Sequence, residues 1–251
     1  MKMGKIELKA DERIDEIASS GVHIIQSKEV FSFSIDAILL ARFPRLPQRG
    51  QIIDLCAGNG AVGLFASSLT KANITELELQ DRLADMAQRS IEFNHLENRM
   101  SVINDNLNRA MSYFNHSSTD LILCNPPYFK VESDSRLNES QHYTLARHEL
   151  TTNLDEIFDI SKKLLKSNGH IAMVHRPERF FEIVDKMRAN NLQPKWIQFV
   201  YPKADSPANI LLIDAIKDGK QGGEVFLPPL IVHHADGTYT KEINDIYYGK
   251  D

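Results

Sequence analysis

Short apolar runs alternate with amphipathic segments along most of the chain from Gln51 onward. The runs are rich in Ile, Leu and Val, as expected for strands buried on both faces, and the segments between them repeat apolar residues with a helical period. This alternation predicts βαβ units and a parallel sheet with helices on both sides. We therefore expect an α/β fold.

The expected elements follow one another in a regular order. The strands are predicted at Ile52–Leu55, Ile74–Leu79, Ser101–Asn104, Leu121–Cys124 and Gly169–Val174. The helices are predicted at Gly60–Leu69, Asp81–Asn94, Asn153–Leu165 and Pro177–Asn190. Two further apolar runs, Trp196–Tyr201 and Ile210–Ile216, are separated only by residues 202–209, so they should pair as an antiparallel hairpin.

Composition narrows the class of protein. A hydrophobic fraction of 42% and a charged fraction of 25% are ordinary for a globular protein, and no run approaches the ~20 apolar residues of a membrane span. The first residues alternate charged with apolar side chains, which is not a secretory signal, so we expect a cytoplasmic protein without a membrane partner. Cys56 and Cys124 end apolar runs and should be buried, and the nine scattered histidines predict no metal site.

A glycine-rich turn follows the first predicted strand. Gly58, Gly60 and Gly63 fit the dinucleotide-binding pattern, and Glu78 lies where an acid would bind ribose hydroxyls. A nicotinamide oxidoreductase would show the same pattern. Asp54 favours S-adenosylmethionine instead, because a carboxylate at the mouth of the turn would repel a pyrophosphate and attract an ammonium and a sulfonium.

The segment Asn125-Pro126-Pro127-Tyr128 closes the fourth predicted strand. The lone pair of an exocyclic amine is delocalised into its ring, so an enzyme that methylates it must localise that pair. The Asn125 side-chain oxygen and the Pro126 carbonyl can accept hydrogen bonds from the amine, and two prolines hold both acceptors in place. Tyr128 offers a face on which an extracted base can stack. We predict a catalytic motif rather than a proline turn.

With these motifs, the sequence resembles the small-domain methyltransferases and, within them, the bacterial tRNA1(Val) N6-adenine methyltransferases, over nearly its whole length. The matching blocks include 24–27, 31–41, 54–60, 78–80, 125–130, 146–149, 175–179, 202–203 and 207–209. The resemblance implies a class I, Rossmann-like fold with seven strands in the order 3-2-1-4-5-7-6, ending in the antiparallel hairpin. It also implies methylation of N6 of an adenine beside the anticodon of a valine tRNA, with no second protein required.

The resemblance also assigns residues to ligands. Those expected to bind S-adenosylmethionine are Ser34, Asp36, Asp54, Ala57, Gly58, Asn59, Gly60, Glu78, Leu79, Asp105 and Asn125. Asp105 would hold the adenine amino group and Leu79 would lie against the ring. Lys130, Arg147, His148, Arg176 and Arg179 are proposed to contact RNA phosphates, which must be a local effect because the net charge is −5. Cys56 departs from the glycine of many members, and its side chain could crowd the cofactor if the turn needs a positive φ.

At 251 residues the chain accommodates one core domain with small additions. Residues 31–43 have a helical pattern before the first strand. We expect residues 1–48 to form an N-terminal extension that packs on the core and closes the cofactor site, and residues 49–251 to form the methyltransferase domain.

Four other functions remain open. The same motif serves N5-glutamine methylation of a protein release factor, although those enzymes carry a larger N-terminal domain, and guanine-N2 methylation of ribosomal RNA, where phenylalanine is commoner at the Tyr128 position. A nicotinamide dehydrogenase would share the glycine turn. A catalytically inactive RNA- or cofactor-binding module would share the fold.

Overall fold

The computed structural model describes residues 6–18, 20–30, 34–127 and 153–248. The strands are β1 (Glu12–Glu16), β2 (His23–Ser27), β3 (Gln51–Leu55), β4 (Asn73–Glu78), β5 (Met100–Asn104), β6 (Thr119–Cys124), β7 (Leu165–His175), β8 (Leu192–Tyr201), β9 (Ile210–Lys217), β10 (Val225–Phe226) and β11 (Leu230–Ile231). The helices are α1 (Ile35–Arg42), α2 (Ala61–Leu69), α3 (Asp81–Phe93), η1 (Leu107–Ser112), α5 (Leu154–Leu164), η2 (Pro177–Arg179), α6 (Phe180–Ala189) and α7 (Lys241–Tyr248).

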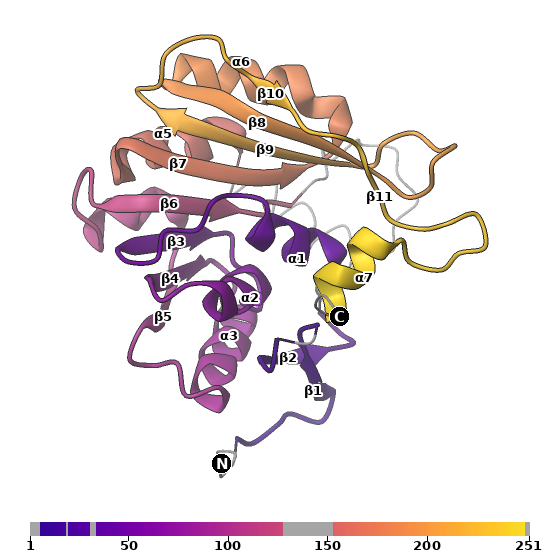
Figure 1. Ribbon diagram of the computed structural model, residues 1–251. Helices are drawn as coiled ribbons and strands as arrows, with labels where there is room; N and C mark the ends of the chain where they lie inside the picture. The colour runs from indigo at the N-terminus through magenta and orange to yellow at the C-terminus, as the bar shows by residue number, and fades with distance from the viewer. Residues whose placement is uncertain (1–5, 19, 31–33, 128–152, 249–251) are drawn as a thin grey trace, which may run out of the picture.

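The main sheet has the strand order β10-β8-β9-β7-β6-β3-β4-β5, with β11 also paired to β8. The pairs among β5, β4, β3, β6 and β7 are parallel, and β9 is antiparallel to both β7 and β8. Numbered from β3, this is the expected order 3-2-1-4-5-7-6, and the predicted β8–β9 hairpin is confirmed (Figure 1).

Helices cover the sheet in two layers. On one face, the core residues of α1 and α2 join Ile91 of α3 and Ile243 of α7 in a single apolar cluster. On the other face, α5 and α6 pack a second cluster that includes Phe158 and Met187. The alternate side chains of each strand therefore divide between two cores, which explains why the strands read as continuous apolar runs.

The chain carries elements beyond the seven expected strands. The β8–β9 hairpin does not end the fold, because β10 and β11 both return to pair parallel with β8 and α7 packs near α1. The expected helix at 177–190 begins as the short turn η2, and β7 and β8 start earlier than predicted. The pattern at 31–43 gives α1, for which Ser34 is the N-cap, and residues 31–33 lie outside the described part.

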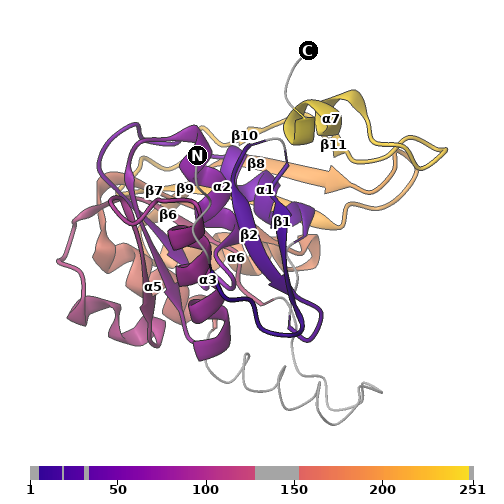
Figure 2. The ribbon, with the colours of Figure 1, turned by 90° about the horizontal axis from the view of Figure 1, so that it is seen from below.

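The N-terminal segment forms an antiparallel hairpin, β1–β2, which the apolar pattern did not reveal. Figure 2 shows this hairpin lying beside α3, and the Ile25 N–H donates to the Ser90 hydroxyl of that helix at 2.9 Å. Arg89 of α3 binds both carboxylate oxygens of Glu12 at 2.8 Å. Strands β1 and β2 are therefore attached to the second helix of the parallel core.

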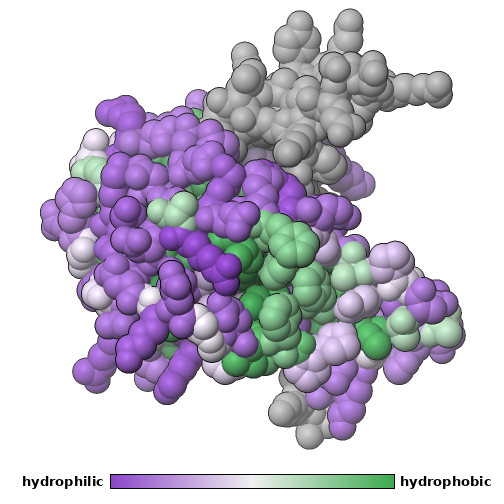
Figure 3. Space-filling model, turned by 90° about the horizontal axis from the view of Figure 1, so that it is seen from above, coloured by the Kyte–Doolittle hydropathy of each residue, from purple (hydrophilic) through white to green (hydrophobic). Residues whose placement is uncertain are grey.

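Apolar side chains are exposed where α6 meets β10. Phe181 is 78% exposed and Phe226 61%, and the ring of Phe226 lies 6.3 Å from that of Phe180. Figure 3 shows an apolar patch on this upper side, surrounded by polar residues. The patch lies beyond the parallel part of the sheet.

Candidate active site

The parallel strands bring the predicted site residues to one edge of the sheet. Asp54 and Glu78 are at the carboxyl ends of β3 and β4, and Asp105 and Asn125 directly follow β5 and β6. In open α/β sheets, ligands bind at this edge. The structure therefore gathers into one region residues that lie far apart in sequence.

The glycine turn bends tightly between β3 and α2. Gly58 has φ +59° and Gly60 has φ +85°, and a Cβ added at Gly58 would meet nothing within 4 Å. Glu78 fixes the turn from the next strand, because its carboxylate accepts hydrogen bonds from the Gly58 N–H at 2.8 Å and from the Gln80 N–H at 2.9 Å. The Ala57 N–H donates to the Leu77 carbonyl. The turn thus leaves open space above its backbone, bordered by a carboxylate.

Asp54 lies beneath the turn and not at its mouth, which corrects the position inferred from the sequence. Its side chain is wholly buried and accepts a hydrogen bond from the Gly63 N–H at 3.0 Å. Burial raises the pKa of Asp54 to about 8, the Gly63 hydrogen bond opposes this rise, and the nearby Glu78 adds to it. Asp54 therefore does not present an exposed negative charge to a sulfonium, and the identity of the ligand rests on other residues.

Glu76 is a second buried acid that the sequence reasoning missed. It is the β4 neighbour of Asp54 in the sheet register, and its side chain is fully buried. Neither of its carboxyl oxygens has a hydrogen-bond partner within the described part of the chain. Burial and the adjacent Asp54 raise the pKa of Glu76 well above its usual range. The sequence feature that could have revealed Glu76 is a glutamate inside an apolar strand, opposite the glycine turn.

Asn59 is buried and faces the N-terminal hairpin rather than the open side of the turn. Its side-chain amide donates to the Ile25 carbonyl of β2 at 3.1 Å. The turn and the N-terminal extension are therefore directly bonded. The cofactor contact expected of Asn59 stays a prediction.

Cys56 adopts φ +59°, the left-handed conformation in which glycine is favoured. Its side chain is half-buried, packs against the apolar cluster that contains Cys124, and belongs to the turn. Cys124 is fully buried, and burial together with the neighbouring Cys56 thiol raises its pKa well above the usual range. Both cysteines have free thiols.

Asp105 lies in the corner between β4 and β5. Its N–H donates to the Glu78 carbonyl at 3.1 Å, and its carboxylate accepts hydrogen bonds from the Asn106 N–H and the Tyr113 hydroxyl. The Tyr113 hydrogen bond is the largest of the effects that lower the pKa of Asp105. Leu79, the predicted ring contact, is 37% exposed beside this corner. Tyr113 was missed because it lies on an irregular turn with no periodic signal.

Asn125, Pro126 and Pro127 continue from β6 at the same edge, with Pro126 buried and its neighbours half-buried. Tyr128 lies outside the described residues. On the adjacent strand, His175 is buried at the end of β7, and its Nδ1 accepts a hydrogen bond from the Arg176 N–H at 2.7 Å. Burial, assisted by Arg179, lowers the pKa of His175 to about 4, so its imidazole is neutral beside the motif.

The expected RNA contacts are only partly described. Arg176 donates to the Asn209 carbonyl at 2.9 Å, and Arg179 makes two hydrogen bonds to Glu182. Both follow β7 at the site edge, but each guanidinium already bonds within the chain. Lys130, Arg147 and His148 lie outside the described residues. Ser34 and Asp36 begin α1, where Asp36 is buried.

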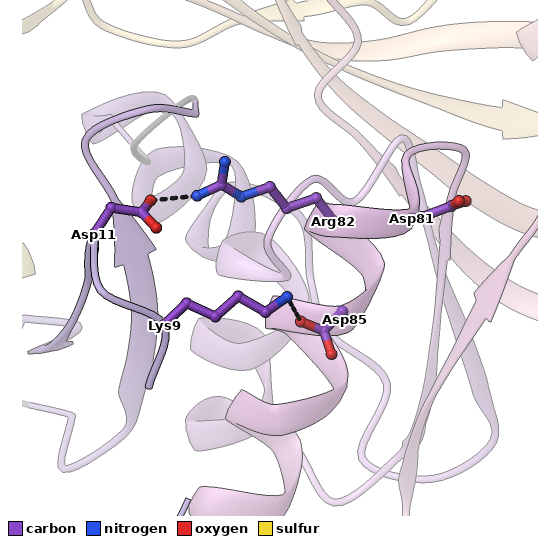
Figure 4. Close-up of a pocket in the computed structure, with 5 residues that line it drawn as sticks. All are labelled: Lys9, Asp11, Asp81, Arg82 and Asp85. Atoms are coloured by element: carbon purple, nitrogen blue, oxygen red, sulfur yellow. Dashed lines mark hydrogen bonds and ion pairs between the residues drawn. The ribbon is translucent and has the colours of Figure 1, made fainter. Parts of the chain in front are cut away.

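A hollow of about 600 Å³ lies between the N-terminal hairpin and the start of α3 (Figure 4). It is lined by Lys9, Asp11, Asp81, Arg82 and Asp85. Arg82 pairs with Asp11 and Lys9 pairs with Asp85 across it, so its charges are largely satisfied. This hollow joins the extension to the core and is not the space above the glycine turn.

Comparison with known proteins identifies the chain. The methyltransferase small domain family matches residues 21–190. The chain belongs to this family. A tRNA1(Val) (adenine(37)-N6)-methyltransferase from Parabacteroides distasonis is 30% identical over 71% of this chain and 74% of its own length. A protein of the same name from Actinobacillus pleuropneumoniae is 26% identical over 90% of this chain and 93% of its own length. The resemblance stated from the motifs is confirmed.

Solved structures support the same fold. A predicted O-methyltransferase from Agrobacterium tumefaciens superposes with a TM-score of 0.69 at 23% identity, covering 85% of this chain and 96% of that one. A geranyl diphosphate C-methyltransferase from Streptomyces coelicolor, solved with S-adenosyl-L-homocysteine, has a TM-score of 0.56 at 13% identity and covers 73% and 75% of the two chains. The family member described here is an S-adenosylmethionine-dependent methyltransferase with a class I fold. No helix among the described residues is long and apolar enough to span a membrane.

Proposed function

We propose that this methyltransferase methylates N6 of an adenine in tRNA, at position 37 beside the anticodon. The proposal rests on one observation above others, the placement of Asn125 and Pro126 at the carboxyl end of β6, beside the glycine turn. The name shared by the relatives supports the choice of tRNA and of this nucleotide.

The residues beside the turn fit S-adenosylmethionine. The open space above Gly58 allows a ligand to approach the backbone, as a nucleoside requires. The Glu78 carboxylate can accept hydrogen bonds from ribose hydroxyls, and Asp105 can accept one from the adenine amino group. The bound cofactor supplies an activated methyl group on a sulfonium. Asp54 would then support the turn through Gly63 and not touch the cofactor.

The protein's own task is to prepare the amine that is methylated. The Asn125 side-chain oxygen and the Pro126 carbonyl would accept the two N–H groups, which favours a pyramidal nitrogen with its lone pair directed at the methyl group. Because φ of both prolines is fixed, the two acceptors are already in place, and little conformational entropy is lost when the reaction occurs. Tyr128 would stack on the base. Transfer leaves a positively charged nitrogen, which then loses one proton to water.

The N-terminal extension would close the cofactor site. The supporting contact is the bond between Asn59 and the Ile25 carbonyl, which joins the hairpin to the turn. The proposed RNA contacts are Lys130, Arg147, His148, Arg176 and Arg179, since an overall charge of −5 leaves phosphate binding to local basic groups. Replacing Arg176 and Arg179 together should reduce the salt dependence of tRNA binding.

The test offers a labelled methyl donor to the enzyme with tRNA, ribosomal RNA and release factor from cells that lack the gene, and then identifies the labelled nucleoside or protein. We expect N6-methyladenosine, in a tRNA that reads valine codons. Methylguanosine in ribosomal RNA, or label that enters only a release factor, would overturn the proposal. Asn125→Ala serves as the inactive control on the same substrates.

A further inference from the structure

Three groups surround the carboxylate of Asp105. Its Oδ1 accepts the Asn106 N–H at 2.7 Å, and its Oδ2 accepts the Tyr113 hydroxyl and lies 3.2 Å from Nη1 of Arg109. Asp105 is only 15% exposed at the side chain, whereas Arg109 is 67% exposed. The carboxylate is therefore enclosed on one side and held in one orientation.

The short helix η1 brings Tyr113 back beside the Asp105 carboxylate. Asn106 caps η1, its side chain accepting from the Asn108 N–H at 2.8 Å, and η1 then carries the chain to Tyr113, eight residues beyond Asp105. The neighbouring Phe114 packs into the core behind η1. The tyrosine ring itself remains 48% exposed, so burial alone does not account for its place.

A carboxylate has about four acceptor positions. In Asp105 the Asn106 N–H and the Tyr113 hydroxyl each use one position, and the guanidinium of Arg109, paired by charge with Oδ2, occupies the space beside that oxygen, which leaves one open position, on Oδ1. A single remaining acceptor in a fixed orientation selects a ligand that presents an N–H donor. A carbonyl oxygen at the position of that N–H would lie against the negatively charged Oδ1 without a hydrogen bond, which is unfavourable.

We propose that Tyr113 is a specificity-determining residue for the cofactor, fixing Asp105 so that the site accepts a 6-amino purine and rejects a 6-oxo purine. This inference rests on the proposed role of Asp105 toward adenine. Tyr113 acts through Asp105 and is a positioning residue. Without its hydroxyl, the carboxylate can rotate toward Arg109 and its free acceptor position is no longer aimed at the ligand.

The test compares binding of S-adenosylhomocysteine with binding of S-inosylhomocysteine, which differs in carrying a carbonyl at the 6-position. For the natural protein we expect a preference of about a hundredfold for the adenosyl compound, by isothermal titration. For Tyr113→Phe, which keeps the ring, we expect this preference to fall about tenfold, chiefly through weaker adenosyl binding. A structural role alone would weaken both ligands equally.

Two variants separate the possible failures. Tyr248→Phe removes an exposed phenol at the C-terminal helix and should leave the preference unchanged. Asp105→Asn should abolish the preference. If Asp105→Asn abolishes it and Tyr113→Phe leaves it at the natural value, the inference about Tyr113 is overturned and the cofactor assignment stands. If Asp105→Asn also keeps the preference, the role of Asp105 in the proposed function is wrong.

Discussion

Two acids lie side by side under the cofactor turn, and no basic side chain of the described residues forms an ion pair with either of them. Asp54 and Glu76 are neighbours in the register of β3 and β4, and both are fully buried. Three of their four oxygens have no hydrogen-bond partner among the described residues. Two adjacent buried carboxylates cannot both be charged at low cost, so at least one proton is retained near neutral pH.

This arrangement predicts the pH dependence of stability. The folded pKa values are raised, to about 8 for Asp54, above those of the unfolded chain. The native state therefore retains protons that the unfolded state loses, and the free energy of unfolding should fall as pH rises from about 4 to about 8. Glu76→Gln removes one titrating group, and its amide can donate to the unpartnered Oδ1 of Asp54.

Glu76→Gln changes the free energy of unfolding at each pH. We expect this change to be more stabilising at about pH 8 than at about pH 5, by about 1–3 kcal/mol. Urea denaturation at the two pH values measures this difference. The matched control is Glu97→Gln at an exposed position, which should leave the slope unchanged. A slope in Glu76→Gln as steep as that of the natural protein would show that the buried pair does not titrate in this range.

At the scale of elements, the start of helix α2 packs closely against strand β4 because two of its positions are glycine and carry no side chain. A Cβ at Gly63 would lie 2.5 Å from Oε1 of Glu76, and one at Gly60 would lie 2.7 Å from Oε2. The first turn of α2 can therefore approach the sheet only because these positions are glycine. The glycines of the turn serve this contact as well as the open space above Gly58.

Alanine in place of a helical glycine usually stabilises a helix by about 1 kcal/mol. At Gly63 we expect the opposite sign, a loss of about 1–3 kcal/mol, because the added methyl overlaps the buried Glu76 carboxyl. The loss should be much smaller when Gly63→Ala is combined with Glu76→Ala. Thermal or urea unfolding of the four proteins in a double-mutant cycle measures the coupling. Additive effects would contradict the contact.

The sequence predicted the elements whose periodicity is strong and missed those that depend on tertiary contacts. The strands from 52 to 124 and the hairpin at 196–216 were predicted within a few residues. In contrast, β10 and β11 have two residues each, too few for a period, and exist because β8 offers an edge. Asp54 was expected at the mouth of the turn, although its position inside a strand that is covered on both faces is consistent with its burial.

For the whole molecule, the β1–β2 hairpin attaches the N-terminal extension to both α3 and the cofactor turn. Arg89 of α3 binds Glu12, whose side chain is fully buried, and also Asp85. The Arg89 hydrogen bonds are the main cause of the lowered pKa of Glu12, so this pairing stabilises the fold above the ordinary glutamate pKa and is lost as pH falls. Asn59 adds the second connection.

Removing Arg89 should therefore release the hairpin. For Arg89→Gln we expect a loss of about 2 kcal/mol, because a buried Glu12 carboxylate is left without its cation, and faster amide exchange in residues 12–27. Arg188→Gln breaks the more exposed pair with Glu224 and should cost under about 0.5 kcal/mol. Weaker S-adenosylhomocysteine binding in Arg89→Gln would support closure of the site by the extension. Unaltered exchange in the hairpin would contradict the anchoring role of Arg89.

The most direct measurement concerns Asn125, because its main proposed role is the preparation of the amine, to which the cofactor contact expected from the sequence is secondary. Single-turnover methyl transfer to tRNA and S-adenosylhomocysteine affinity are measured in parallel for the natural protein and for Asn125→Ala. The account predicts a loss of transfer of at least about a hundredfold, with the cofactor affinity changed by less than about twofold. An Asn125→Ala protein that transfers methyl groups at the natural rate would contradict it.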